Sequence, residues 1–294
     1  MKNPFMKNCA LLCIVALLST GSAIQSKAAV IHTPQAAGTT AYNSSKASID
    51  VSNASQGYVM IKYTGSNPKV KIQIIKDTTY TYDIANTGNY VTFPLTEGNG
   101  SYAIKIYENV SGTSYAQAVS QNINVTLADP LLPFLYPNQF CDFNAGSAVV
   151  ATSDALTAGI TDPVAKVAAV YNYVVSNFTY DYNKAATVQS GYLPVVDATL
   201  ATRTGICFDY AAVMTSMLRA QGIPTKLVIG YAGDVYHAWV SIYIHGQGWI
   251  DNIIYFDGTN WQMMDPTFAS SGKKSPEVLN YISNPANYHA KFSY

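Results

Sequence analysis

The fold is decided by residues 204–224, which read TGICFDYAAVMTSMLRAQGIP. Apolar side chains follow Cys207 at steps of three and four residues, a spacing that predicts a helix with one apolar face. Gly222 stands where such a helix needs a residue in the left-handed conformation, and Pro224 prevents its continuation. The stretch therefore predicts a helix that begins at Cys207 and ends before Gly222.

Cys207 stands in the first turn of this expected helix, at the positive end of the helix dipole. This setting favours the thiolate, which is the nucleophilic form of cysteine. Gly205 has no Cβ that could obstruct a substrate approaching the thiol. On this stretch alone a buried core cysteine is the alternative, because free cysteines are among the most buried residues.

The composition is that of a packed globular protein. The chain has 294 residues, enough for two domains, and is 49% hydrophobic with 12% charged residues. Its 17 basic and 17 acidic residues give a formal net charge of zero. This balance offers no electrostatic attraction to nucleic acid or to an anionic membrane, so neither is expected as a partner.

The first residues have the pattern of a secretory signal peptide. Two lysines precede an apolar run at 10–18 that is too short to span a bilayer. Residues 26–28 (SKA) fit the small-x-small cleavage pattern, and residues 21–23 (GSA) are an earlier option. We therefore expect residues 1–28 to be a signal peptide and the protein to be secreted, without stable membrane insertion after cleavage. An uncleaved membrane anchor is the alternative.

Cleavage would leave two cysteines in the chain, Cys141 and Cys207. A secreted protein could join them in one disulfide. A nucleophilic Cys207 requires instead that its thiol be free.

Between about residues 48 and 127, short alternating runs recur between turn signals. Runs of this length and spacing predict a small β-sandwich of immunoglobulin-like type. The sandwich shows no cluster of titratable residues, so we expect it to position or bind substrate and to contribute no chemistry. The expected strands are 57–63, 69–76, 80–84, 90–95, 101–108 and 115–127.

A Pro-rich segment that begins at residues 129–130 predicts a domain boundary. We expect a β-sandwich domain at 30–128, a linker at 129–159 and a catalytic domain at 160–294. A chain that begins near Leu131 should then keep turnover on a small amide. Beyond the linker, Thr161 or Asp162 can cap a helix that has Pro163 as its first residue.

Two expected strands, 226–231 and 237–244, follow the cysteine helix, and His237 opens the second of them. The pleat places His237 and Trp239 on one face, while apolar residues at 238, 240, 242 and 244 share the other. Trp239 is therefore a candidate wall residue of a substrate groove beside His237.

A third expected strand, 261–265, ends at Pro266 and leaves Asp265 at its tip. A single histidine or aspartate at a strand end is more often a surface or capping residue. The combination with Cys207 is more specific, because a thiol needs a base and an imidazole needs an acceptor that fixes its tautomer. Two adjacent antiparallel strands could bring His237 and Asp265 side by side, with the helix start aimed at the imidazole.

Four ordered motifs in the chain resemble those of the transglutaminase-like superfamily, over roughly residues 160 to 270. The resemblance implies an α+β fold with a papain-like core, preceded here by the small all-β sandwich. It further implies that Cys207 is the nucleophile, His237 the base and acid, and Asp265 the orienting carboxylate. Tyr192 is a candidate substrate-binding residue and oxyanion donor. The motifs are GICFDYA at 205–211, GIPT at 222–225, HAWV at 237–240 and DPT at 265–267.

No cofactor or metal is expected. The histidines lack metal-ligand spacing, and the chain shows no acidic cluster like the calcium sites of animal cross-linking enzymes. The Cys-Gly-x-Cys-Trp signature of true papain-like proteases is also missing.

The sequence thus predicts a secreted, two-domain thiol enzyme that acts on amide bonds of a protein or peptide, with a cell-wall peptide as one option. Hydrolysis is favoured over transfer because the catalytic domain is little more than the minimal motifs. The alternatives are a protein cross-linking transglutaminase and a non-catalytic surface-binding protein with the same fold.

Overall fold

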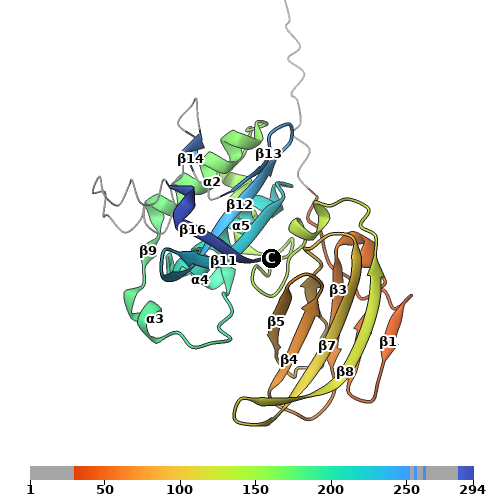
Figure 1. The fold of residues 1–294 in the computed structure, drawn as a ribbon. Coiled ribbons are helices and arrows are strands. Elements are labelled where there is room, and N and C mark those ends of the chain that lie inside the picture. Colours follow the sequence, from red (N-terminus) through yellow and green to blue (C-terminus); the bar gives the residue numbers. More distant parts are fainter. Residues whose placement is uncertain (1–29, 252–254, 257–260, 263–283) are drawn as a thin grey trace, which may run out of the picture.

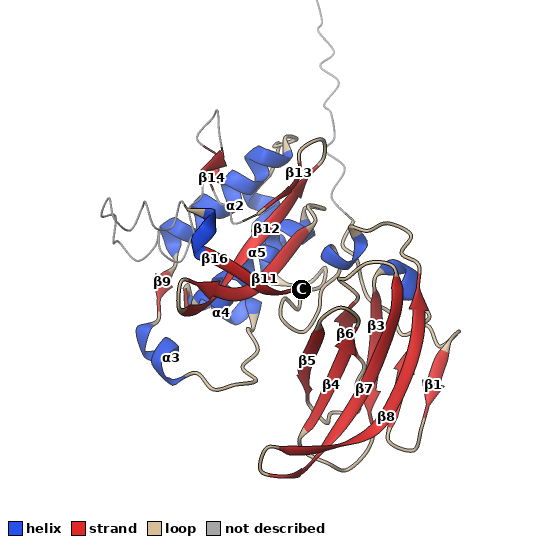
Figure 2. Cartoon of the chain, in the orientation of Figure 1, coloured by secondary structure: helices blue, strands red, loops and turns tan. Residues whose placement is uncertain are grey.

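The computed structural model describes residues 30–251, 255–256, 261–262 and 284–294. Strands dominate the part that follows the N-terminal residues, whereas helices and strands together build the rest, an α+β arrangement as expected (Figures 1 and 2). The expected signal peptide at 1–28 and Asp265 lie outside the described residues. No helix in the described part is long and apolar enough to cross a membrane.

Two four-stranded antiparallel sheets make the all-β part, with the strand orders β1-β2-β3-β6 and β5-β4-β7-β8. These strands form because buried apolar residues alternate with more exposed ones. Along β4 every second residue, Val70, Ile72 and Ile74, is buried in the core. The bounds are β1 Ala41–Asn43, β2 Ala47–Asp50, β3 Tyr58–Tyr63, β4 Val70–Ile75, β5 Thr79–Ile84, β6 Val91–Pro94, β7 Gly100–Ser111 and β8 Ser114–Val125, with the 3-10 helix η1 at Ala54–Gln56.

The six strands expected from the sequence correspond to β3 through β8, whereas β1 and β2 were not expected. All four residues of β2 are buried, so its polar Ser48 and Asp50 do not alternate with exposed positions. Asp50 instead accepts hydrogen bonds from the N–H groups of Gly38 (2.6 Å) and Ser52 (2.9 Å). A strand buried on both faces lacks the pattern that predicts half-buried strands.

The segment expected to be a linker, 129–159, contains the 3-10 helix η2 (Leu132–Phe134) and the helix α1 (Ala148–Leu156). Helix α1 packs against α5 (Cys207–Ala220), and the hydroxyl of Ser153 donates to the carbonyl of Met217 (2.8 Å). This segment is thus part of the packed α+β layer. The division into domains stays a prediction.

Helix α5 is the centre of the α+β part. It packs against α1, α2 (Pro163–Asn177), α4 (Val196–Thr202) and the strands β11 and β12. Every residue from Asp209 to Ala220 is buried, including Thr215, Ser216 and Arg219. The apolar residues of the predicted face, such as Met214, Met217 and Leu218, are buried, and the remaining faces are buried as well because the helix packs against several other elements.

The predicted C-terminal end of α5 and the predicted N-terminal cap of α2 are both confirmed. Gly222 has φ +72°, and the N–H groups of Gly222 and Ile223 donate to the carbonyls of Arg219 (2.9 Å) and Leu218 (3.0 Å). This paired geometry is the Schellman motif, which satisfies carbonyls at the helix end. At the start of α2, the carboxylate of Asp162 accepts from the N–H of Ala165 (2.8 Å).

The sheet beside α5 has the order β13-β12-β11-β16, with all pairs antiparallel. The neighbours of β12 are therefore β11 and β13. Strand β15 pairs with β14 in a separate ladder, so the described part of the third expected strand does not lie beside β12. The bounds are β11 Thr225–Ala232, β12 Val235–Ile244, β13 Gly248–Ile250, β14 Tyr255–Phe256, β15 Trp261–Gln262, η3 Pro285–Asn287 and β16 Tyr288–Ser293.

The C-terminal strand joins the two parts of the molecule, and Figure 1 marks this end of the chain between them. The ring of Tyr294 lies 5.4 Å from that of Tyr80 and 5.7 Å from that of Tyr82, both in β5. It also packs on Phe140, with ring centroids 4.4 Å apart. These aromatic contacts hold the β5 face of the sandwich against the α+β part.

Candidate active site

Cys207 is the first residue of α5, as expected. The short strand β10 (Thr204–Gly205) pairs in parallel with β9 (Thr179–Tyr180) and leads into Ile206, the extended N-cap residue of α5. The Cys207 side chain is half-buried and its thiol is free. The alternative of a fully buried core cysteine is therefore wrong.

Cys141 is also a free thiol, so the alternative of a Cys141–Cys207 disulfide is not seen. It is buried completely, and its sulfur accepts from Nη1 of Arg219 at 3.3 Å. Burial raises the pKa of Cys141 more than the neighbouring guanidinium lowers it. Of the two cysteines, only Cys207 combines exposure with a helix N-terminus.

A buried carboxylate, Asp209, organises the entrance to α5. It is the third residue of the helix, is 0% exposed and accepts from the N–H of Ile206 at 2.8 Å. Lys184, in the short helix α3 (Tyr182–Thr187), donates to Asp209 Oδ2 at 2.7 Å, and the hydroxyl of Tyr192 donates to Oδ1. Asp209 thus ties two distant segments to the residue that precedes Cys207.

The electrostatics of Lys184 and Tyr192 follow from this arrangement. Burial lowers the pKa of Lys184, but hydrogen bonds to Asp209 and Tyr192 and the Asp209 charge outweigh it, and the net pKa is raised. Burial and then the hydrogen bond to Asp209 raise the pKa of Tyr192. Lys184 therefore stays cationic and Tyr192 neutral at physiological pH.

Gly205 makes room for Asp209. A Cβ on this glycine would lie 2.6 Å from Cβ and 2.8 Å from Oδ2 of Asp209, closer than non-bonded atoms approach. From the sequence we expected the missing side chain to serve substrate access. The structure shows that the space is filled by a carboxylate of the same motif.

His237 lies near the start of β12, opposite Gly230 of β11, and is 5% exposed. Its ring is stacked near Trp239, with centroids 6.2 Å apart and planes at 22°, and lies 6.4 Å from Tyr288. Cys207 and His237 both line one cavity of about 670 Å³. The structure therefore brings two of the three expected catalytic residues to the same cavity.

The two candidate substrate-binding residues, Trp239 and Tyr192, differ in whether they line this cavity. Trp239 is 2% exposed, packs with Val228, Ala232 and Tyr288, and is not among the described residues that line the cavity. The described geometry does not support its assignment to the groove wall, because its ring packs against that of Tyr288 in β16, with centroids 5.4 Å apart. Tyr192 does line the cavity. Its hydroxyl donates to Asp209 and accepts from Lys184 at 2.6 Å. Because its one O–H already donates to Asp209, this hydroxyl is not an oxyanion donor in this arrangement.

The cavity has walls from both parts of the molecule. The sandwich contributes Lys71, Thr81, Tyr82 and Asp83, although no titratable cluster was apparent there from the sequence. Lys71 and Asp83 form an ion pair at 2.7 Å between neighbouring strands. The sandwich therefore forms part of the wall around the thiol, in agreement with a positioning or binding role, and the expectation that it contributes no chemistry stays a prediction.

Three residues of this region were not predicted from the sequence: Lys184, Asp209 and Gln139, the last of which also lines the cavity. An acidic residue three positions after an N-cap is a known pattern at helix starts, so the role of Asp209 at the start of α5 could have been predicted from the sequence. Lys184 carried none, because its partner is 25 residues away and only the tertiary fold joins them. Among the described residues, no group of three or more His, Cys, Asp or Glu side chains could hold a metal ion.

Comparisons with known proteins show what this part of the chain is similar to. Residues 150–266 match the sequence model of the transglutaminase-like superfamily. Over 129 residues the chain is 32% identical to the uncharacterized protein YebA of Bacillus subtilis, covering 37% of this chain. Over 117 residues it is 34% identical to a protein-glutamine gamma-glutamyltransferase of Pseudomonas aeruginosa, covering 34% of this chain. In each case the match spans 17% of the relative's length.

Among solved structures, a candidate cysteine protease from Cytophaga hutchinsonii is similar with a TM-score of 0.41 and 16% identity. The match covers 86% of this chain and 83% of that one. Residues 150–266 are thus similar in sequence to a transglutaminase-like core domain.

Proposed function

We propose that this protein is a secreted thiol enzyme that attacks carboxamide groups of a protein or peptide through Cys207, His237 and Asp265, and that water is its usual acyl acceptor. The observation that carries the proposal is the free Cys207 thiol at the start of α5, in one cavity with His237. The family match supports it, because residues 150–266 include all three residues. The signal-peptide pattern of 1–28 supports secretion.

The chemistry proceeds in two halves. His237 accepts the thiol proton, Cys207 Sγ attacks the carbonyl carbon, and N–H groups of the first turn of α5 face the oxyanion. The C–N bond then breaks, His237 returns its proton to the leaving nitrogen, and a thioester remains. Water loses a proton to His237 as it attacks the thioester, which releases a carboxylic acid and the free thiol.

Asp265 is assigned the third role, acceptor of the His237 N–H, on the motif that surrounds it. The substrate is proposed as a polypeptide, with a cell-wall peptide as one option, because both parts of the molecule border the cavity.

The test begins with iodoacetamide and peptide mapping, which should find Cys207 alkylated and Cys141 unmodified. The protein is then incubated with casein and with a blocked glutaminyl-glycine dipeptide, in the presence of a labelled primary amine. New termini or glutamate formed from glutamine, lost in Cys207→Ala, would support a hydrolase. Cys207-dependent incorporation of the amine would make it a transferase. An unreactive Cys207 with no product would support a binding protein.

A further inference from the structure

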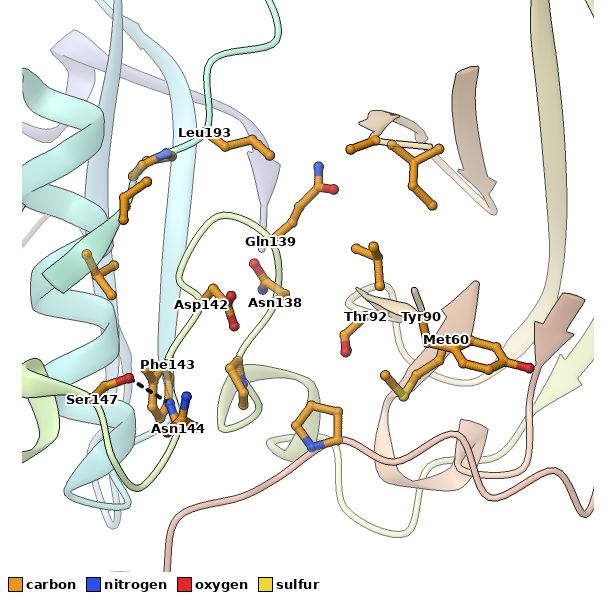
Figure 3. Close-up of a pocket in the computed structure, with 18 of the residues that line it drawn as sticks. Met60, Tyr90, Thr92, Asn138, Gln139, Asp142, Phe143, Asn144, Ser147 and Leu193 are labelled. Atoms are coloured by element: carbon orange, nitrogen blue, oxygen red, sulfur yellow. Dashed lines mark hydrogen bonds between the residues drawn. The ribbon is translucent and has the colours of Figure 1, made fainter. Parts of the chain in front are cut away.

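A second cavity of about 660 Å³ adjoins the one that holds Cys207. It lies between the sandwich and the segment 137–147 of the α+β part (Figure 3). Asp83, Gln139 and Leu193 line both cavities, so the two meet along these three side chains. A molecule that extends from the thiol past Gln139 would therefore enter the second cavity.

Two carboxamide donors at this junction have no hydrogen-bond acceptor among the described residues. Asn138 is 3% exposed, and its Oδ1 accepts from the N–H of Phe140 at 3.0 Å, but its Nδ2 has no partner there. Nε2 of Gln139 is likewise buried without a partner. A buried donor without an acceptor is destabilising, and native structures keep few of them. The two groups together are suited to oxygen acceptors that arrive with a ligand.

One carboxylate in the second cavity also lacks a partner in the part of the chain that the structure describes. Asp197 accepts from the N–H groups of Ala148 (3.0 Å) and Val149 (2.9 Å), and Asp83 pairs with Lys71. Asp142 is exposed and makes no hydrogen bond or ion pair with any described residue, and partial desolvation raises the pKa of its carboxyl. Figure 3 shows Asp142, Asn138 and Gln139 on one side of the cavity, with Thr92 and Tyr90 of the sandwich on the opposite side.

Resting on the proposed function, we propose that the second cavity is a subsite for the polypeptide that flanks the reacting carboxamide. Asn138 and Gln139 donate to backbone carbonyl oxygens of that polypeptide, and Asp142 accepts from the ammonium group of a basic residue. Free amides and a free carboxylate are complementary to a peptide that carries a lysine-like side chain. The subsite selects substrates by a residue remote from the reacting bond.

The test measures the rate at which Cys207 is alkylated, which does not require a known substrate. The probes are iodoacetamide and N-iodoacetyl pentapeptides in which lysine, or norleucine as its uncharged analogue, is placed at each position in turn. In the parent protein, one lysine peptide should react at least tenfold faster than iodoacetamide, and faster than its norleucine analogue.

Gln139→Met removes the donor at similar length, and Asp142→Asn removes the charge at the same shape. Gln139→Met should slow the best lysine peptide about three- to tenfold, the usual effect of losing one hydrogen bond. Asp142→Asn should abolish the preference for lysine over norleucine. The iodoacetamide rate of each variant is the reference against which its peptide rates are compared. Matched controls are Gln117→Met and Asp77→Asn, at exposed residues of the sandwich that are not among the residues lining either cavity.

Equal rates for lysine and norleucine peptides in the parent, or unchanged peptide rates in both variants, would overturn the subsite. Failure of iodoacetamide to label Cys207 in the parent would instead contradict the proposed function. Thermal unfolding of each variant separates a local effect from loss of the fold, and the two variants act at different residues, so one misfolded variant leaves the other decisive.

Discussion

The ammonium of Lys184 lies 2.7 Å from Oδ2 of Asp209, whose side chain is fully buried two residues after Cys207. Lys184 itself keeps 28% of its side chain exposed. The two partners therefore differ in their access to solvent: the Lys184 ammonium could be hydrated if the pair were broken, whereas the Asp209 carboxylate could not. This relationship determines how each substitution should act.

Lys184→Met should destabilise the protein more than Asp209→Asn. The first leaves a buried carboxylate without its cation, a change that costs about 3–5 kcal/mol in other buried pairs. Asp209→Asn keeps the shape and leaves a lysine that can reach solvent, so about 1–2 kcal/mol is expected. Urea unfolding of the two variants and of the double variant measures both effects.

In the double variant, the neutral amide that replaces the Asp209 carboxylate no longer needs a cation, so the combined loss should be smaller than the sum of the single losses. Lys69→Met, an exchange of the same type at an exposed residue of the sandwich, is the control and should change the free energy of unfolding little. An Asp209→Asn loss equal to or larger than that of Lys184→Met would contradict this account.

Gly205→Ala should destabilise the fold through the Asp209 side chain. The new Cβ would lie 2.6 Å from Asp209 Cβ, and forced contacts of this kind cost about 1–3 kcal/mol. Gly146→Ala is the matched control, since its Cβ would meet only the side-chain Oδ1 of Asn144, at 3.2 Å. Thermal unfolding and the iodoacetamide rate of Cys207 are the measurements. A Gly205→Ala protein as stable and reactive as the parent would show that the motif tolerates a side chain there.

The sequence predicts what depends on neighbouring residues and misses what depends on the tertiary fold. Asp162 at the start of α2 and Gly222 beyond α5 were predictable, because caps act within a few residues. The alternation of residues along β12 correctly predicted the face on which Trp239 lies. It did not predict that Trp239 is buried, because this depends on packing against Tyr288 of β16, far along the chain. The Lys184–Asp209 pair has no sequence signature for the same reason.

The site shows the same division. The position of Cys207 follows from a local helix start and was predictable. The walls of its cavity combine β5, residues near 139 and the loop near 190, which no local pattern joins. Asp265 lies outside the described residues, and its role stays a prediction.

Stability should fall as the pH rises above about 10. Tyr82 is 2% exposed, and burial raises its pKa well above the ordinary value of 10.0. A raised pKa in the folded state gives stability that is complete below about pH 10 and is lost at higher pH, where the unfolded chain releases the proton first. Each such tyrosine adds a slope of up to about 1.4 kcal/mol per pH unit.

Tyr82→Phe should therefore make the alkaline loss less steep by about 1.4 kcal/mol per pH unit, measured by urea unfolding across the alkaline range. Tyr42→Phe, at a side chain 40% exposed, is the control and should follow the parent curve. Identical slopes for the parent and Tyr82→Phe would show that this hydroxyl does not govern the transition.

Asp265→Asn should leave the fold intact and lower kcat by roughly 10²–10⁴, the range expected when a triad loses its orienting carboxylate. The reason is that His237 would lose the acceptor that holds its tautomer and supports its charge. Steady-state kinetics on whichever amide substrate the protein hydrolyses provide the measurement, with the exposed Asp251→Asn as control. Turnover near that of the parent would remove Asp265 from the mechanism.

A chain that begins at Leu131 should not fold as a stable unit, contrary to what the sequence suggested. Two sandwich tyrosines cover three aromatic rings of the α+β part, and a truncated chain would expose those rings to water. The tyrosines are Tyr80 and Tyr82, and the rings are Phe140, Phe292 and Tyr294. Exposing the three rings would cost on the order of 3–6 kcal/mol, a large share of the stability of a typical domain.

The truncated protein should therefore aggregate or unfold non-cooperatively, as gel filtration and calorimetry would show. Replacing Phe292 and Tyr294 by serine in the truncated protein removes exposed apolar surface and should reduce the aggregation without restoring the Cys207 cavity. A monomeric 131–294 protein with a cooperative transition and the parent's rate of alkylation by lysine-containing iodoacetyl peptides would show that the sandwich is dispensable.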